Sequence, residues 1–367
     1  MGDSFIFVFP GGKRLRLWNS IVLGAKNRRD EDYMHHKYKR LEIAHLPTPL
    51  ERAERLTAAL DGSELYIKRD DATGLAGGGN KARKLEYLVA DALEQGANCL
   101  ATVGGPQSNH ARMTAAIAAR LGMRCRLYLK GQRPLRLLGN LLIDRLMGAQ
   151  LVFCGDAEYP EIYARMDTDA QQFAKQGIHV YQVPLGGSTP MGALGYVRAM
   201  TEELVPQCKA MGIKPQAVIV AVGSGGTMAG LMLGLTIAGW ADVAVHGYCV
   251  SGTVQSLQQG VARIYNDASQ LLGIPQRIKP ELVLLDASQI GEGYGIATPG
   301  CLEALKLFAR TEGLLLDSVY TAKAAAGMIA DIRRGKWQQG PIVFIHTGGW
   351  PALFAKTDVE KSLHKED

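Results

Sequence analysis

Short apolar runs alternate with stretches in which apolar residues recur every three or four positions, from about residue 42 onward. The runs predict buried β-strands, and the longer spacing predicts amphipathic helices. We expect strands at residues 64–68, 99–103, 125–129, 150–153, 180–183, 217–222, 243–250 and 342–345. We expect helices at residues 82–94, 110–121, 136–147, 162–175, 192–208, 227–237, 253–272, 301–311 and 322–333. This order predicts an α/β protein with mainly parallel sheets covered by helices, and 367 residues suffice for about two domains.

The first 33 residues do not follow this pattern, and we expect them to form a flexible extension. Residues 1–40 hold nine Lys/Arg and four Asp/Glu, so they carry +5 of the net charge of +6. The rest of the chain is therefore nearly neutral and has no basic stripe, so nucleic acid is not an expected partner. Its apolar runs, such as residues 217–222, are too short to cross a membrane.

The cysteines and histidines give no sign of a metal site. None of the six cysteines forms a C-x-x-C pair, and the eight histidines show no H-E-x-x-H spacing. We expect no metal, and we expect buried, reduced cysteines in a cytoplasmic protein.

Parallel sheets bind ligands where strands end and helices begin, so the candidate functional residues are expected at these junctions. Asn80 and Lys81 follow three glycines at a predicted helix start. The positive end of a helix dipole lowers the pKa of an amine, which favours an imine-forming lysine. The alternative is a solvated lysine beside a flexible turn. Arg83 and Lys84 are expected to be charges on the helix surface.

Two further junctions favour anions. Residues 107–110 (Gln107, Ser108, Asn109 and His110) open a helix and could hold a carboxylate, although Ser108 could equally be a simple N-cap. The second is a glycine-rich turn that favours a phosphate group at a helix start. It comprises Gly223, Ser224, Gly225, Gly226 and Thr227. A dinucleotide fingerprint fails there because Met228 stands where its third glycine belongs.

The last candidates lie in the C-terminal third. They are Tyr294, Tyr320 and the segment 346–349, and a loop tyrosine taken alone is more often a packing residue than a catalytic one. Together with the earlier junctions, they complete a pattern.

That pattern resembles the fold type II (tryptophan synthase β-like) enzymes that use pyridoxal 5′-phosphate (PLP). Within that group, the chain is similar to the D-cysteine desulfhydrase and 1-aminocyclopropane-1-carboxylate (ACC) deaminase family. The matching segments run in family order over roughly residues 40–356. They are 46–50 (LPTPL), 67–71 (IKRDD), 78–86 (GGNKARKLE), 107–110 (QSNH), 192–196 (GALGY), 294–295 (YG), 316–317 (LD), 319–320 (VY) and 346–349 (HTGG).

The resemblance implies a role for each candidate. Lys81 would form the covalent imine with PLP, next to Asn80, and Asn109 would bind the 3′-oxygen of the ring. Residues 223–227 would bind the phosphate. Residues 107–110 would bind a small amino-acid substrate, with Ser108 holding its carboxylate and assisting proton transfer. Tyr294 and Tyr320 would face that substrate as polar or acid–base groups.

The resemblance also implies the domain organisation and the assembly. A larger PLP-binding domain would comprise residues 34–84 and 191–367, and a smaller domain, residues 85–190, would be inserted into it. The expected assembly is a homodimer.

Two threonines favour one activity within the family. ACC deaminases carry a glutamate and a leucine where this chain has Thr321 and Thr347, as D-cysteine desulfhydrases do. A hydroxyl near the pyridine nitrogen makes a weaker electron sink than a carboxylate, yet one sufficient to expel hydrosulfide. We therefore expect conversion of D-cysteine to pyruvate, hydrogen sulfide and ammonia.

The alternatives are ACC deamination and L-cysteate sulfo-lysis, because segment 130–138 looks shorter than the family loop. A NAD(P)-dependent oxidoreductase is disfavoured by Met228. The alternative from a different functional class is an α/β protein that binds a ligand without catalysis.

Overall fold

The structure is a computed structural model that describes residues 6–8, 14–16, 38–338 and 340–364. Most of the predicted extension, residues 1–33, therefore lies outside the described residues. Its two described segments, β1 (Ile6–Val8) and β2 (Arg14–Arg16), pair with each other in antiparallel fashion.

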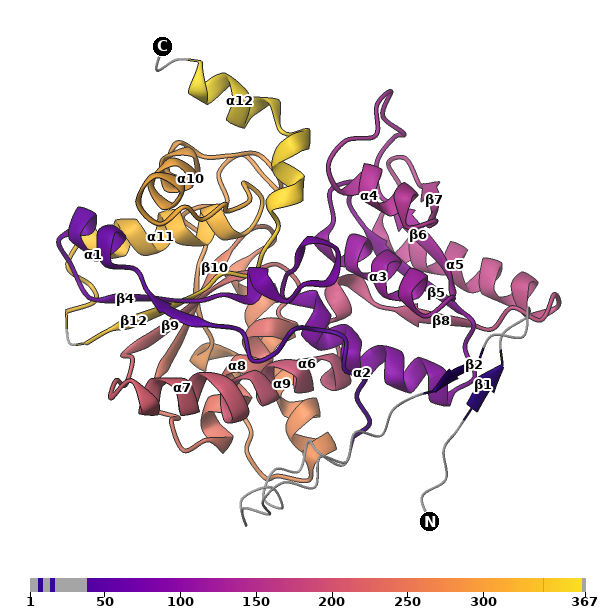
Figure 1. Cartoon of the computed structure of the whole chain (residues 1–367), viewed down its shortest axis with the longest axis horizontal. Helices are drawn as coiled ribbons and strands as arrows, with labels where there is room; N and C mark the ends of the chain where they lie inside the picture. The colour runs from indigo at the N-terminus through magenta and orange to yellow at the C-terminus, as the bar shows by residue number, and fades with distance from the viewer. Residues whose placement is uncertain (1–5, 9–13, 17–37, 339, 365–367) are drawn as a thin grey trace.

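Two separate sheets form the framework (Figure 1). The six-stranded sheet has the order β11-β10-β9-β12-β4-β3, and all its neighbouring strands are parallel except β3 with β4. The four-stranded sheet has the order β7-β6-β5-β8 and is parallel throughout. The bounds are β3 Leu50–Arg52, β4 Leu65–Lys68, β5 Cys99–Gly104, β6 Arg124–Leu129, β7 Gln150–Phe153, β8 Val180–Val183, β9 Ala217–Val222, β10 Ala244–Cys249, β11 Leu284–Asp286 and β12 Ile342–Ile345.

Helices cover both faces of the larger sheet, because its central strands β9 and β12 are apolar on both sides. One face packs against α6 to α9, and the other packs against α1, α10 and α11 (Figure 1). Helices α2, α3 and α4 pack on the smaller sheet, with α5 on its other face. The bounds are α1 Glu54–Leu60, α2 Lys81–Glu94, α3 Asn109–Arg120, α4 Asn140–Leu146, α5 Tyr159–Ala174, α6 Pro190–Arg198, α7 Val205–Ala210, α8 Gly226–Ile237, α9 Val254–Leu272, α10 Pro299–Glu312, α11 Thr321–Arg333 and α12 Thr357–Leu363.

The α/β fold predicted from the sequence is confirmed, and each predicted strand is present within two residues of its expected bounds. Two helix predictions were wrong in detail. Helix α4 begins at Asn140 instead of residue 136, because Gly139 has a φ of 56° and cannot continue a helix from residue 136. The single helix expected at 192–208 is α6, a π-helical segment Ala199–Leu204 and α7.

The strands of the larger sheet come from residues 50–68 and 217–345, whereas those of the smaller sheet come from residues 99–183. The domain bounds proposed above, 34–84 with 191–367 and 85–190, stay a prediction. In the described part of the chain, no helix combines the length and the apolar character needed to span a bilayer.

Candidate functional site

A cavity of about 370 Å³ opens where strands of both sheets end. Gly104 ends β5 and Gly105 follows it. Lys130 follows β6, Gly223 follows β9, and Thr347 lies two residues beyond the end of β12. All these residues line the cavity at the carboxyl ends of parallel strands, which is the usual ligand position in such sheets.

The cavity brings together most of the residues that the sequence singled out. Those that line it are Asn80, Lys81, Ser108, Asn109, His110, Gly223, Ser224, Gly225, Thr227, Tyr294, Tyr320 and Thr347. Gln107, Gly226 and Thr321 are not among its lining residues. Gln107 instead joins α4 to this region, because its Oε1 accepts a hydrogen bond from the Asn140 amide at 2.9 Å.

Lys81 is the first residue of α2 and follows a turn that only glycine can form easily. Gly77, Gly78 and Gly79 have φ angles of 84°, 72° and 135°. A Cβ atom on Gly78 would lie 1.7 Å from the Asp71 carbonyl oxygen, so any larger residue would displace the backbone. Burial lowers the pKa of the Lys81 amine to about 8, although the charge of Asp317 acts in the opposite direction.

The prediction that Arg83 and Lys84 are surface charges was wrong. Both side chains are about 1% exposed, because α2 packs against α6 on one side and α3 on the other. Lys84 lines the cavity, and its Nζ donates hydrogen bonds to Gly186 O at 3.2 Å and Ser188 Oγ at 3.3 Å. Burial, and then the charge of Lys81, lower the Lys84 pKa well below its usual range.

The start of α3 supplies the second wall. Ser108 is the N-cap, and its Oγ accepts a hydrogen bond from the Ala111 amide at 3.1 Å. The Asn109 side-chain oxygen accepts a hydrogen bond from Asn140 Nδ2 at 2.9 Å. Burial, with the charges of Lys81 and Lys84, holds the pKa of His110 well below its usual value, so its ring is neutral.

The glycine turn before α8 supplies the third wall. Gly225 has a φ of 84°, and the turn leads into a helix of 12 residues. A Cβ atom on Gly226 would lie within 3 Å of Ser188, so the turn can approach that segment only with glycine. Asn80 Nδ2 donates a hydrogen bond to Thr227 Oγ1 at 3.0 Å, which ties the turn to the start of α2. The amides at a helix start favour an anion, although the Gly226 amide here already donates a hydrogen bond to Ser188 Oγ at 3.2 Å.

Two tyrosines form the opposite wall. The hydroxyl oxygens of Tyr294 and Tyr320 lie 2.5 Å apart, and their rings meet edge to face. Burial raises the pKa of Tyr294 to about 12, and burial also holds the pKa of Tyr320 well above its ordinary value. Both hydroxyls are therefore protonated at neutral pH and can donate or relay a proton.

Asp317 is a buried residue that belongs to the matching segment 316–317 but had no role assigned from the sequence. Its carboxylate accepts hydrogen bonds from the amides of Val319, Tyr320 and Thr321 at 3.2, 3.1 and 2.9 Å. Thr321 Oγ1 also donates to it at 2.8 Å, which explains why Thr321 faces Asp317. Asp317 thus holds Tyr320 at the cavity. An acid shortly before a helix start was the available signal.

The cavity also contains residues that were not proposed as site residues from the sequence. These are Lys84, Lys130, Tyr159, Leu185, Gly186, Ala221, Val222, Ser251 and Met228. Ala221 and Val222 end β9, and Lys130, Leu185, Gly186 and Ser251 shortly follow other strands, so the positions of these six depend on how the two sheets face each other.

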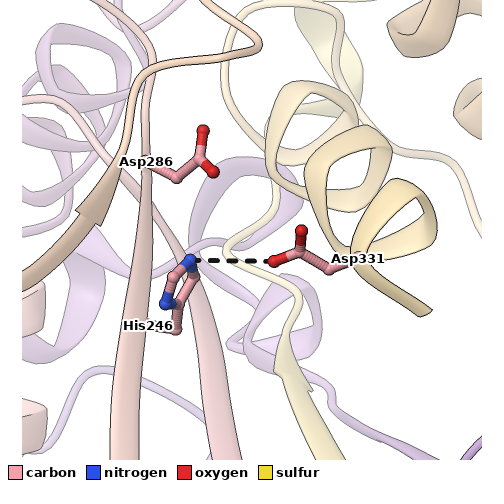
Figure 2. A group of neighbouring side chains, drawn as sticks. All are labelled: His246, Asp286 and Asp331. Carbon is pink, nitrogen blue, oxygen red and sulfur yellow. Dashed lines mark ion pairs between the residues drawn. The ribbon is translucent and has the colours of Figure 1, made fainter. Parts of the chain in front are cut away.

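Among the described residues, one group has ligand atoms close enough for a metal, namely His246, Asp286 and Asp331 (Figure 2). Asp331 already accepts hydrogen bonds from Tyr248 at 2.7 Å and Lys336 at 2.6 Å, and it also pairs with Arg334. The charge of Asp331 is therefore already balanced. The group fits an ion-pair network better than a metal centre, and none of its residues lines the cavity.

The chain is similar in sequence to a known protein family and to proteins of known activity. The family model described as "Pyridoxal-phosphate dependent enzyme" matches residues 41–348. D-cysteine desulfhydrase of Salmonella typhi is 43% identical over 337 residues, covering 88% of this chain and 98% of that protein. The protein of the same name from Salmonella newport is 42% identical, with the same coverage of both chains.

Solved structures agree with this similarity. The chain matches a crystal structure described as an ACC deaminase homologue with 34% identity and a TM-score of 0.81, covering 90% of this chain and 98% of that one. A threonine deaminase from Solanum lycopersicum matches with 19% identity and a TM-score of 0.58, covering 87% and 84%. This second likeness concerns the fold alone.

Proposed function

Because the chain belongs to the family of pyridoxal-phosphate dependent enzymes, we propose that it is a carbon–sulfur lyase acting on D-cysteine. The observation that carries this proposal is 43% identity across nearly the whole length of a D-cysteine desulfhydrase. In this reaction D-cysteine and water give pyruvate, hydrogen sulfide and ammonia.

The residues of the cavity fit the cofactor that the family requires. An amine of lowered pKa, Lys81, lies between glycine-rich turns, as an imine-forming lysine needs. The start of α8 offers amide N–H groups for a phosphate group, and the nearby Lys84 amine is a further hydrogen-bond donor. No Asp or Glu lines the cavity within the described residues, so nothing there repels that phosphate.

PLP, when bound, supplies an electron sink for negative charge that develops at the substrate Cα. The other contributions come from the chain itself. Ser108 and the first amides of α3 hold the substrate carboxylate, and the amine of Lys81 takes the Cα proton. The Cβ–S bond then breaks, and its electron pair leaves with sulfur.

Tyr294 and Tyr320 are suited to provide the proton for the departing sulfur, since both residues line the cavity and both hydroxyls stay protonated. Their 2.5 Å contact allows one hydroxyl to resupply the other. The three-carbon fragment takes up water outside this step to give pyruvate and ammonia.

Desulfhydration is favoured over ACC deamination by the lining of the cavity. Opening an unactivated cyclopropane needs a strong electron sink, for which a carboxylate beside the pyridine nitrogen is suited. Thr347 lines the cavity, whereas the hydroxyl of Thr321 donates a hydrogen bond to the Asp317 carboxylate. No carboxylate lines the cavity in the described part of the chain.

We also propose that the enzyme is a homodimer in the cytoplasm. All six cysteines are free, which suits a reducing compartment. Leu142 and Leu146 form an exposed apolar stripe on α4, with Leu135 and Leu138 beside it. Such a stripe is typical of a surface that associates with another copy.

The decisive experiment compares D-cysteine, L-cysteine, L-cysteate and ACC as substrates of the purified holoenzyme. We expect sulfide and pyruvate from D-cysteine and visible cofactor absorbance. Lys81→Ala should lower the rate by about a thousandfold or more, because it removes both the covalent anchor and the base. Lys209→Ala, a change at an exposed lysine on α7, is the control. Turnover of ACC without release of sulfide from D-cysteine would refute the proposal.

A further inference from the structure

The charges that line the cavity leave one cation without an assigned role. Among the described residues, the lining contains three lysines, Lys81, Lys84 and Lys130, and no acid. Lys81 is assigned to the covalent bond with PLP. Lys84 donates hydrogen bonds to Gly186 and Ser188, beside the glycine-rich turn 223–227. Lys130 lies elsewhere, on the wall formed by the smaller sheet.

The backbone of Lys130 is held firmly next to the substrate-binding turn. Lys130 follows β6, and its amide donates a hydrogen bond to Gly104 O at 2.9 Å. The next residue, Gly131, exchanges two hydrogen bonds with Gly155, at 2.7 and 3.1 Å. Because Gly104 ends the strand that leads to Ser108, Lys130 projects from the strand end beside the predicted carboxylate site.

The side chain of Lys130 is less firmly held than its backbone. Its Nζ lies 2.6 Å from Glu158 Oε1, but the two side chains are 34% and 69% exposed. Its Nζ also lies 5.7 Å from the centre of the Tyr159 ring, which itself lines the cavity. An exposed ion pair of this kind is weak, so an anion inside the cavity can compete for the ammonium group.

We propose that Lys130 is a specificity-determining residue whose ammonium group binds a negatively charged group on the substrate β-carbon. This inference rests on the proposed function, since it assumes an amino acid whose carboxylate lies at the start of α3. The side group then extends toward the wall of Lys130, Tyr159, Tyr294 and Tyr320. The preferred substrates are therefore amino acids with an anionic side group, including the thiolate form of cysteine.

The test uses D-aspartate and D-asparagine, which have nearly the same shape but differ in side-group charge. Dissociation constants are measured on the holoenzyme from the change in cofactor absorbance, and independently from the shift in thermal unfolding. We expect wild type to bind D-aspartate more tightly, and Lys130→Gln to weaken D-aspartate by about tenfold, the loss expected for one charge-assisted hydrogen bond. D-Asparagine binding should change less than about twofold, and Lys130→Arg should keep the preference.

Two further variants separate electrostatic selection from a structural role. Glu158→Gln breaks the same ion pair but frees the lysine, so it should strengthen D-aspartate binding, opposite in sign to Lys130→Gln. Lys214→Gln is the matched control, because Lys214 also pairs with an acid at 2.6 Å and lies 5.7 Å from an aromatic ring centre. It is not part of the cavity lining and should leave both constants unchanged.

The inference is overturned if Lys130→Gln keeps the wild-type preference, or if Lys130→Gln and Glu158→Gln change binding in the same direction. Wild type that binds D-aspartate through Lys130 but releases no sulfide from D-cysteine would refute the proposed function alone. Sulfide release from D-cysteine with no preference for D-aspartate would refute this inference alone. The L-enantiomers are measured in parallel, so that the choice of enantiomer does not decide the result.

Discussion

Lys81 and Lys84 are separated by about one turn of α2, and the surroundings lower both of their pKa values. Burial is the main cause for each, because a charged amine loses contact with water. Both residues line the cavity, but the Lys84 amine donates hydrogen bonds to Gly186 and Ser188. The two residues have the same chemistry but different neighbours, and only Lys81 is suited to attack an aldehyde.

This difference predicts the pH dependence of cofactor capture by the apoenzyme. Only the neutral amine attacks an aldehyde, so a lowered pKa makes capture possible at lower pH. With the Lys81 pKa at about 8, the capture rate should rise between about pH 7 and 9, with its midpoint near 8. Stopped-flow absorbance after mixing with PLP measures it. A midpoint above about 10, the range of an exposed lysine, would contradict the assignment.

Asp317→Asn is the companion variant. The negative charge of Asp317 raises the Lys81 pKa, so its removal should move the midpoint to lower pH. A shift to higher pH would contradict this electrostatic effect of Asp317 on Lys81.

At the scale of elements, the position of α2 depends on unusually close helix contacts. Gly195 on α6 faces α2, and a Cβ atom there would lie 2.2 Å from Arg83 O. Gly230 and Gly234 on α8 face α6, where a Cβ atom would lie 2.5 and 2.7 Å from Ala193 O and Val197 O. Backbone oxygens cannot move aside as flexible side chains can. These glycines therefore set the distances between the neighbouring helices α2, α6 and α8.

Gly195→Ala should therefore push α2, and with it Lys81, away from its place. We expect a loss of about 2–3 kcal/mol in stability from overpacking, and a fall in catalytic efficiency. Gly260→Ala on α9 is the matched control, since no atom lies within 4 Å of the added Cβ. That change should be neutral or stabilising by up to about 1 kcal/mol. Thermal unfolding and sulfide release measure both, and equal effects would rule out the contact as the cause.

The same elements show what the sequence can reveal. The strands and most helices were predictable because apolar periodicity follows directly from burial of one face or both faces. The glycine turns were predictable because positive φ angles need glycine, as Gly78 and Gly225 show. The short strands β3 and β11 carry too few residues to show a period. Burial of Arg83 and Lys84 arises only when α2 is enclosed by helices of both layers, which no local pattern records.

For the whole molecule, a buried ion network links segments that are far apart in the sequence. Arg83 on α2 donates hydrogen bonds to Asp70, just after β4, and to Glu203 in the π-helical segment. Lys68 Nζ also lies 2.9 Å from Glu203 Oε2. The network therefore holds the larger sheet, α2 and the helical layer in one arrangement behind the cavity.

Lowering the pH should weaken this network, because Glu203 loses its charge when it is protonated. Burial pushes the Glu203 pKa up, but Arg83 and Lys68 outweigh burial, so the pKa lies below its ordinary 4.5. A carboxylate with a lowered folded pKa stabilises the fold above its unfolded pKa, and this stability is lost as the pH falls toward the folded pKa. Glu203→Gln should therefore cost about 3 kcal/mol at pH 7, because it leaves buried cations without their partner. Its difference from wild type should shrink below about pH 4.5.

Urea unfolding followed by tryptophan fluorescence at several pH values measures this difference. Glu303→Gln, which removes the acid of an exposed pair with Arg333, is the control and should change stability by less than about 1 kcal/mol. A Glu203→Gln difference that stays constant down to pH 3 would mean that Glu203 contributes shape and hydrogen bonds, with no net electrostatic contribution. Shrinkage of the difference on acidification would instead show that its charge holds α2, and so Lys81, against the larger sheet.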